Sequence, residues 1–255
     1  KNFVHEKDLF GVGYNYIHYP FLNDGTYSTL KDKIEKYFQK SGRKSILVGY
    51  DQGANFIHNF ITNFVSVDWA KKYVSALIFY APFFGGSASY DKLVTGNFGS
   101  GFPDTNAEMK KSTSRMPGLH VMMPNEAVFG DKTVIRDFPN PGDSSDSSFA
   151  SNLLIQMGQM DTTAETIFHL TDKYRKIAPK EPPVTSLIFY NDELNTNNGY
   201  VYNKNTNSVT PIIGKGDGTV SSDGADYACK NWGSSICFNF NTSRVNHENI
   251  PLHLE

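Results

Sequence analysis

The chain has 255 residues, which is enough for one large domain with a substantial hydrophobic core. Its formal net charge of −2 provides no basic surface for nucleic acid, so we expect no nucleic-acid partner. No apolar stretch approaches the roughly 20 residues that cross a membrane, and the chain starts at Lys1 with neither an initiator Met nor a signal peptide, which predicts a processed piece of a longer protein.

The first part of the chain alternates helical and strand patterns. Apolar residues recur at helical spacing in residues 29–42, and the buried strand pattern "SILVGY" follows at 45–50. After a sharp turn, a second apolar helical face covers 54–65, and "VSALIFYAP" at 74–82 has the pattern of another buried strand. This order predicts an α/β fold with a mostly parallel sheet and helices on both of its faces.

The middle of the chain changes character. Residues 96–150 are rich in Gly, Pro and Ser with little periodicity, which predicts a lid or a set of surface loops. A helical pattern returns at 162–178, a core strand follows within 183–192, and 200–210 has the pattern of a β-hairpin. We therefore divide the chain into a first core part, a lid excursion and a second core part, at 1–95, 96–165 and 166–255.

The only two cysteines lie close together, as Cys229 and Cys237. A metal site would need more ligands at tighter spacing, so we predict a short-loop disulfide, with two free thiols as the alternative, and no metal. Asn241 begins the only N-x-S/T sequence and is a candidate glycosylation site. Together these features favour a secreted or lumenal protein.

Residues 49–55, "GYDQGAN", lie between a predicted strand and a predicted helix. Serine hydrolases present their nucleophile in this context, in the form G-x-S-x-G, but here the central residue is Asp51. An acid and then a histidine should follow, because a histidine base must be held in one tautomer by a buried carboxylate. Asp217 in "GKGDGTVSS" and His247 in "VNHENIP" are the candidates in that order.

These motifs resemble those of the family of lecithin:cholesterol acyltransferase and the lysosomal phospholipase. The family has G-H-S-x-G at its nucleophile and then W-x-x-K-Y, and here Trp69, Lys72 and Tyr73 occupy the latter positions. "APFFGGS" is similar to its A-P-W-G-G-S, and "SRMPGLHVMMPNEAVFG" resembles its S-x-x-P-x-x-x-x-x-x-P segment. "GDGTV" and "HENI" resemble its acid and histidine motifs, so that the resemblance covers about residues 9–250.

The resemblance implies an α/β-hydrolase core with a lid, and acyl transfer from glycerophospholipids without a cofactor. It assigns Asp217 as the orienting acid, His247 as the base, and the backbone amide of Gln52 as an oxyanion contact. The family places many more residues before the elbow than the 50 present here, so we expect its N-terminal strands to be absent. We therefore expect a second chain or a missing segment to complete the core. The segment "GYNYIHYP" also departs from the family's Y-D-W-R by lacking its Asp and Arg.

The aspartate at the elbow leaves three hypotheses open. A carboxylate that attacks an ester would form a mixed anhydride and expel a more basic alkoxide, and its charge would oppose a developing oxyanion. The first hypothesis is therefore a family member without acyl chemistry, which binds lipid or protein or serves structurally. The second is an active phospholipase or acyltransferase, or one trapped by a Ser-to-Asp change, that uses Asp217 and His247. The third is a hydrolase with an aspartate nucleophile, of the epoxide hydrolase or dehalogenase type.

Overall fold

A four-stranded parallel sheet forms the centre of the fold, with strand order β1-β2-β5-β8. The computed structural model describes residues 4, 7–20, 23–88, 111–130, 132, 135–136, 144–145, 161–175, 177–203 and 208–253. The first three predicted strands are confirmed, and β8 was not predicted from the sequence. The bounds of the four strands are Ser45–Tyr50 (β1), Val74–Tyr80 (β2), Ser186–Tyr190 (β5) and Ser235–Asn239 (β8).

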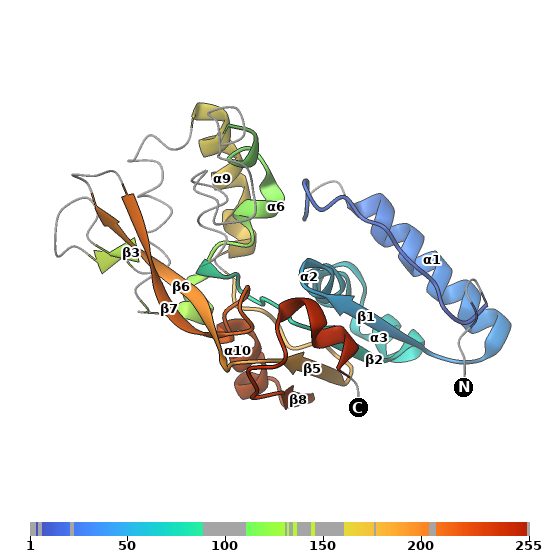
Figure 1. The fold of residues 1–255 in the computed structure, drawn as a ribbon. Coiled ribbons are helices and arrows are strands. Elements are labelled where there is room, and N and C mark those ends of the chain that lie inside the picture. Colours follow the sequence, from blue (N-terminus) through green and yellow to red (C-terminus); the bar gives the residue numbers. More distant parts are fainter. Residues whose placement is uncertain are drawn as a thin grey trace.

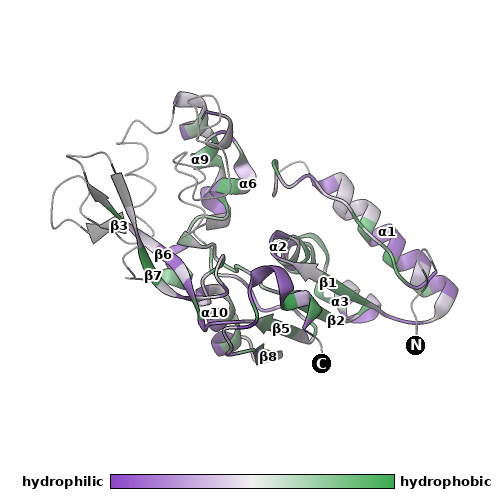
Figure 2. Cartoon of the chain, viewed as in Figure 1, coloured by the Kyte–Doolittle hydropathy of each residue, from purple (hydrophilic) through white to green (hydrophobic). Residues whose placement is uncertain are grey.

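Helices cover one face of this sheet and share a continuous hydrophobic core with it. The core joins inward-facing strand residues such as Leu77 and Ile188 to the apolar sides of the helices, and hydrophobic residues follow the strands in Figure 2. α1 ends as predicted at Gly42, whose N–H donates to the Phe38 carbonyl. The covering helices are α1 (Asp24–Ser41), α2 (Gln52–Asn59) with its π-helical extension η1 (Phe60–Phe64), α3 (Val67–Tyr73) and α10 (Asp223–Asn231).

The opposite face of the sheet is apolar and largely uncovered. The strand register aligns Val48, Ile78, Leu187 and Ile236 in one row across all four strands. A short 3-10 helix, η3 (His247–Leu252), packs Ile250 over the middle of this face. Within the described residues η3 is the only helix found against this face, which is therefore covered far less than the first.

A second sheet lies to one side of the parallel sheet (Figure 1). Its main part is an antiparallel hairpin of β6 (Leu194–Asn203) and β7 (Ser208–Gly216), which confirms the predicted hairpin and extends it at both ends. Short strands and helices complete this region, and most of the predicted lid excursion lies outside the described residues. These elements are β3 (Ile135–Arg136), β4 (Ser144–Ser145), α6 (Pro117–His120), α7 (Glu126–Phe129) and α9 (Thr162–Arg175).

Two further sequence expectations concern the cysteines and the membrane. Cys229 and Cys237 form a disulfide, which joins α10 to β8. No helix in the part of the chain that the structure describes is long and apolar enough to cross a membrane. The division into a first core part, a lid and a second core part stays a prediction.

Candidate active site

The sharp turn between β1 and α2 holds Asp51 in a backbone conformation that few non-glycine residues adopt, with φ 52° and ψ −123°. Its N–H donates to the Tyr80 carbonyl, 3.0 Å away at the end of the neighbouring strand. Gly49 makes the turn feasible, because a Cβ there would lie 2.6 Å from the Gly53 carbonyl oxygen. The local sequence therefore builds a nucleophile-elbow geometry around an aspartate.

Asp217 lies in the turn after β7, where its side chain is almost completely buried. One carboxylate oxygen, Oδ1, accepts hydrogen bonds from the backbone N–H groups of Thr219 and Val220, at 3.0 and 2.7 Å. The other oxygen, Oδ2, lies 2.7 Å from His247 Nδ1. Since the backbone of the turn fixes Asp217, the carboxylate is oriented towards the histidine.

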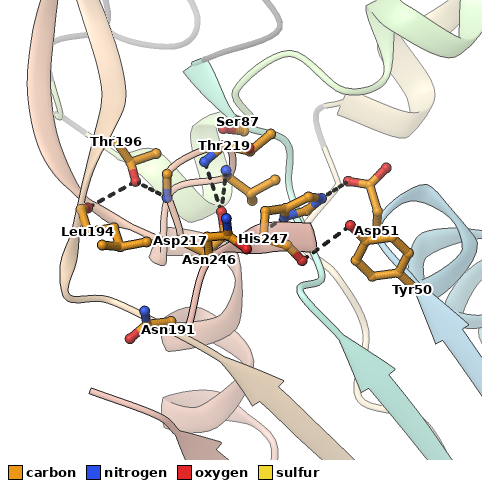
Figure 3. A network of polar contacts seen from close by, with 12 residues as sticks. Tyr50, Asp51, Ser87, Asn191, Leu194, Thr196, Asp217, Thr219, Asn246 and His247 are labelled. Carbon is orange, nitrogen blue, oxygen red and sulfur yellow. Dashed lines mark hydrogen bonds and ion pairs between the residues drawn. The ribbon is translucent and has the colours of Figure 1, made fainter. Parts of the chain in front are cut away.

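His247 links the acid to the elbow (Figure 3). Its backbone N–H donates to the Asp217 carbonyl at 2.9 Å, and its carbonyl accepts a hydrogen bond of 3.2 Å from the Tyr50 hydroxyl. On the far side of its ring, Nε2 lies 3.3 Å from Asp51 Oδ1. The structure thus brings together all three side chains that the sequence singled out, from positions far apart in the chain.

The two carboxylates control the charge of the histidine. Burial by itself lowers the pKa of His247, but hydrogen bonds to Asp217 and Asp51, together with their negative charges, outweigh burial and raise that pKa to about 9. At neutral pH the ring is therefore an imidazolium between two acidic side chains. Burial, followed by the charge of Asp51, raises the pKa of both Tyr14 and Tyr50 to about 12, so these phenols are neutral.

Gln52, the residue after the elbow, has a buried side chain that contacts the N-terminal segment. Its Oε1 accepts a hydrogen bond of 3.3 Å from the Tyr14 hydroxyl, and its Nε2 donates to the Tyr16 carbonyl at 3.4 Å. The role of its backbone amide in an oxyanion site stays a prediction. Sequence reasoning missed Tyr14 and Tyr50 as parts of the site. Tyr14 lies in "GYNYIHYP", but that segment was compared with the family motif only for the Asp and Arg that it lacks.

One remaining candidate, Asn241, lies apart from these contacts. Asn241 follows β8, is exposed and has a positive φ of 46°, and its glycosylation stays a prediction. Among the residues that the structure describes, no group of three or more His, Cys, Asp or Glu residues could hold a metal ion.

Comparison with protein families now adds to this geometry. The model of the family described as lecithin:cholesterol acyltransferase matches residues 2–178 of the chain. The chain belongs to the lecithin:cholesterol acyltransferase family. The matched region contains the elbow with Asp51 and ends before Asp217 and His247, whose place in the site follows from their contacts.

The α/β-hydrolase fold of this acyltransferase-family chain is confirmed by the first of two similar solved structures. A chain of the Tle4–Tli4 complex is 14% identical with a TM-score of 0.54, over 90% of this chain and 63% of that one. The rice cell wall degrading esterase LipA from Xanthomonas oryzae is 12% identical with a TM-score of 0.39, over 92% of this chain and 62% of that one. The chain thus spans less than two thirds of both. No curated protein sequence matches it.

Proposed function

We propose that this member of the acyltransferase family does not transfer acyl groups by the serine route, and that it acts by binding a lipid or another protein. The observation that carries the proposal is the row Asp51, His247 and Asp217, in which the imidazole lies 3.3 and 2.7 Å from two carboxylates that raise its pKa. Acyl transfer requires a neutral histidine that can accept the proton of a nucleophile. It also requires donors around a developing oxyanion, where Asp51 instead places negative charge.

The test compares the unmodified protein with Asp51→Ser in hydrolysis of a fluorogenic acyl ester. We expect no turnover above buffer from the unmodified protein. The substitution removes one carboxylate beside His247, so the pKa of His247 should fall and the ring should become able to act as a base. Esterase activity in the unmodified protein that is lost in His247→Ala would overturn the proposal. Co-sedimentation with phosphatidylcholine vesicles separates a lipid-binding role from a protein-binding one.

A second candidate function is hydrolysis with Asp51 as the nucleophile, and the 3.3 Å approach of His247 Nε2 to Asp51 favours it. The Asp51 carboxylate would attack a saturated carbon, and that carbon's bond to its leaving group would break with the electron pair on the leaving group. The resulting ester would carry no charge, so the pKa of His247 would fall. As its pKa falls, the imidazolium would give its proton to the oxygen of the opened epoxide. The neutral ring could then deprotonate a water that attacks the ester carbonyl. The ester C–O bond would break, the expelled oxygen would take up the proton of the newly formed acid, and the alcohol would leave with Asp51 ionised and His247 protonated again.

This candidate ranks second because the phenols that interact electrostatically with Asp51 already donate to protein acceptors. Tyr14 donates to Gln52 and Tyr50 donates to the His247 carbonyl, so neither is poised to assist a leaving group. A single turnover of an epoxide in heavy-oxygen water, followed by mass spectrometry, should label the Asp51 carboxylate if this route operates. Turnover that leaves the Asp51 peptide unlabelled would exclude it.

We also propose that a further segment, upstream in the same gene product or from a second chain, completes the core. The support is the uncovered face of the parallel sheet, where Val48 and Ile236 are 56% and 50% exposed in the same cross-strand row. β1 is also the end strand of this sheet, which presents an edge for pairing. Apolar surface of this kind marks an interface.

Hydrogen exchange tests this proposal on the complete product of the source gene and on the present chain. We expect slower exchange of the β1 amides in the complete product, because a covering or pairing segment excludes water. If both proteins are monomeric by light scattering and their β1 amides exchange at the same rate, the proposal of a covering segment, from the same gene product or from a second chain, is contradicted. Slower exchange only in a dimer would assign the segment to a second chain.

Finally, we propose a secreted or lumenal location with a glycan at Asn241, supported by the disulfide between Cys229 and Cys237. Expression in glycosylating cells should yield a protein whose electrophoretic mobility increases after glycosidase treatment. The variant Asn241→Gln should lack this shift, and Asn239→Gln, two residues away on the same strand end, should retain it. A shift that persists in Asn241→Gln would place the glycan elsewhere.

A further inference from the structure

The turn that carries Asp217 is held partly by its own hydrogen bonds and partly by a neighbouring strand. Within the turn, the Asp217 N–H donates to the Val220 carbonyl at 3.1 Å, and the N–H groups of Thr219 and Val220 donate to the Asp217 carboxylate. The N–H of Gly218, which lies between them in the sequence, instead donates outside the turn. Its acceptor is the side-chain oxygen Oγ1 of Thr196, 2.8 Å away. A residue that the sequence motifs did not single out therefore supports the turn from outside.

Thr196 lies on β6, near the point where β7 runs into this turn. It is 1% exposed, so its hydroxyl is part of the packed interior. The approach of the strand to the turn is close, because a Cβ on Gly216 would lie 2.6 Å from Thr196 Oγ1 and 2.8 Å from Thr196 Cβ. The glycine at the end of β7 is thus what allows Thr196 to reach the turn.

The Thr196 hydroxyl has a defined orientation. A hydroxyl has one proton and two lone pairs, so it can donate one hydrogen bond and accept another at the same time. The Thr196 hydroxyl donates to the Leu194 carbonyl, 3.0 Å away on the same strand. This leaves its lone pairs for the Gly218 N–H, and Figure 3 shows the line of contacts from Leu194 through Thr196 to the turn. Valine, which has the same shape but no hydroxyl, would remove this acceptor.

The contacts between Asp217 and His247 depend on where the turn lies. Asp217 Oδ2 lies 2.7 Å from His247 Nδ1, and the Asp217 carbonyl accepts the His247 N–H at 2.9 Å. Hydrogen bonds weaken steeply as their geometry departs from the optimum. A turn that is displaced or more mobile would therefore weaken both contacts at once.

We propose that Thr196 is a positioning residue of the candidate site, which holds the turn through the Gly218 N–H and so keeps Asp217 in contact with His247. The second sheet then has a direct role at the elbow, because β6 supplies this support. The proposal rests on the same row of side chains as the proposed function, but it applies to any chemistry at that row.

NMR titration of the His247 ring in the intact chain tests the proposal. Burial lowers the pKa of His247, and the hydrogen bond to Asp217 is the largest of the contributions that raise it, so this pKa reports how well Asp217 is held. Thr196→Val should lower the pKa of His247 by roughly one pH unit. Thr196→Ser keeps a hydroxyl and should titrate as the unmodified protein does. The matched control is Thr210→Val, at an exposed threonine on β7 of the same hairpin, which should also leave the pKa unchanged.

Three results would overturn the proposal. The first is a Thr196→Val titration that matches the unmodified protein, even if the variant is less stable, because a purely structural threonine would affect stability without moving the pKa. The second is a fall in the pKa that Thr196→Ser or Thr210→Val shares. The third needs no variant: the Gly218 amide of the unmodified chain should exchange its hydrogen roughly tenfold or more slowly than in the unfolded chain, and equally fast exchange would exclude the hydrogen bond.

The same titration separates this proposal from the proposed function. An unmodified protein in which His247 is neutral at pH 7 would contradict the proposed function. The difference between Thr196→Val and Thr196→Ser would still decide whether Thr196 positions the acid.

Discussion

The two faces of the parallel sheet differ in how completely helices cover them. On one face, Leu77, Phe79 and Ile188 are completely buried beneath α1, α2, α3 and α10. On the other face, Val48 and Ile236 remain half exposed, and η3 covers only the middle. Both faces are equally apolar in sequence, so hydrophobic pattern by itself does not decide whether a strand residue is covered.

The geometry of the candidate site depends little on how the two faces of the sheet are covered. Asp51, Asp217 and His247 are held by backbone hydrogen bonds and by the turns at the ends of the strands, as Figure 3 shows. The site is therefore assembled although one face of the sheet lacks a full covering layer.

The largest effect is expected from truncation on the covered face. Phe79→Ala removes a fully buried ring that packs edge-on against Phe84, and should lower the free energy of unfolding by about 3–5 kcal/mol. The control is Val48→Ala on the exposed face, which should change that free energy by about 0.5 kcal/mol or less. Urea unfolding of the isolated chain measures both, and similar losses would contradict the difference between the faces.

The next effect is a dependence of stability on pH in a defined window. The pKa of His247 is raised to about 9 in the folded chain, above the ordinary value of 6.5, so the folded state binds the proton more tightly. The resulting stabilisation, on the order of 3 kcal/mol, is fully present below pH 6.5 and is lost as the pH rises to 9. Unfolding free energies measured across this window should fall in the unmodified protein and stay nearly level in His247→Gln. An equal fall in the variant would assign the pH dependence to other groups.

A smaller effect is expected at the elbow, where two nearby glycines differ in their surroundings. A Cβ on Gly49 would lie 2.6 Å from the Gly53 carbonyl oxygen and 2.7 Å from Ala54 Cα, so Gly49→Ala should destabilise the chain by about 1–3 kcal/mol. A Cβ on Gly53 would meet nothing closer than the Tyr14 hydroxyl at 4.0 Å. Gly53→Ala, in the first turn of α2, should therefore be neutral or slightly stabilising in the same unfolding assay.

Much of the fold was predictable because its elements have strong periodic patterns. The strands at 45–50 and 74–80, the helix α1 and the hairpin of β6 and β7 all follow from local sequence. β8 was missed because it has only five residues, and its two large apolar side chains, Ile236 and Phe238, are exposed on the outer face. The place of β8 in the sheet comes from its pairing with β5, which no local sequence pattern predicts.

The sequence by itself determined the elbow and the order of its partners, because a glycine-framed turn after a buried strand and two short motifs downstream are local features. Only the tertiary structure decided what these residues do to one another. The 2.7 Å contact of His247 with Asp217 and the 3.3 Å contact with Asp51 join positions far apart in the chain, and together they raise the pKa of the histidine. The contact of Tyr14 with Gln52 and the uneven covering of the sheet also depend on long-range packing, which apolar pattern and motif spacing do not encode.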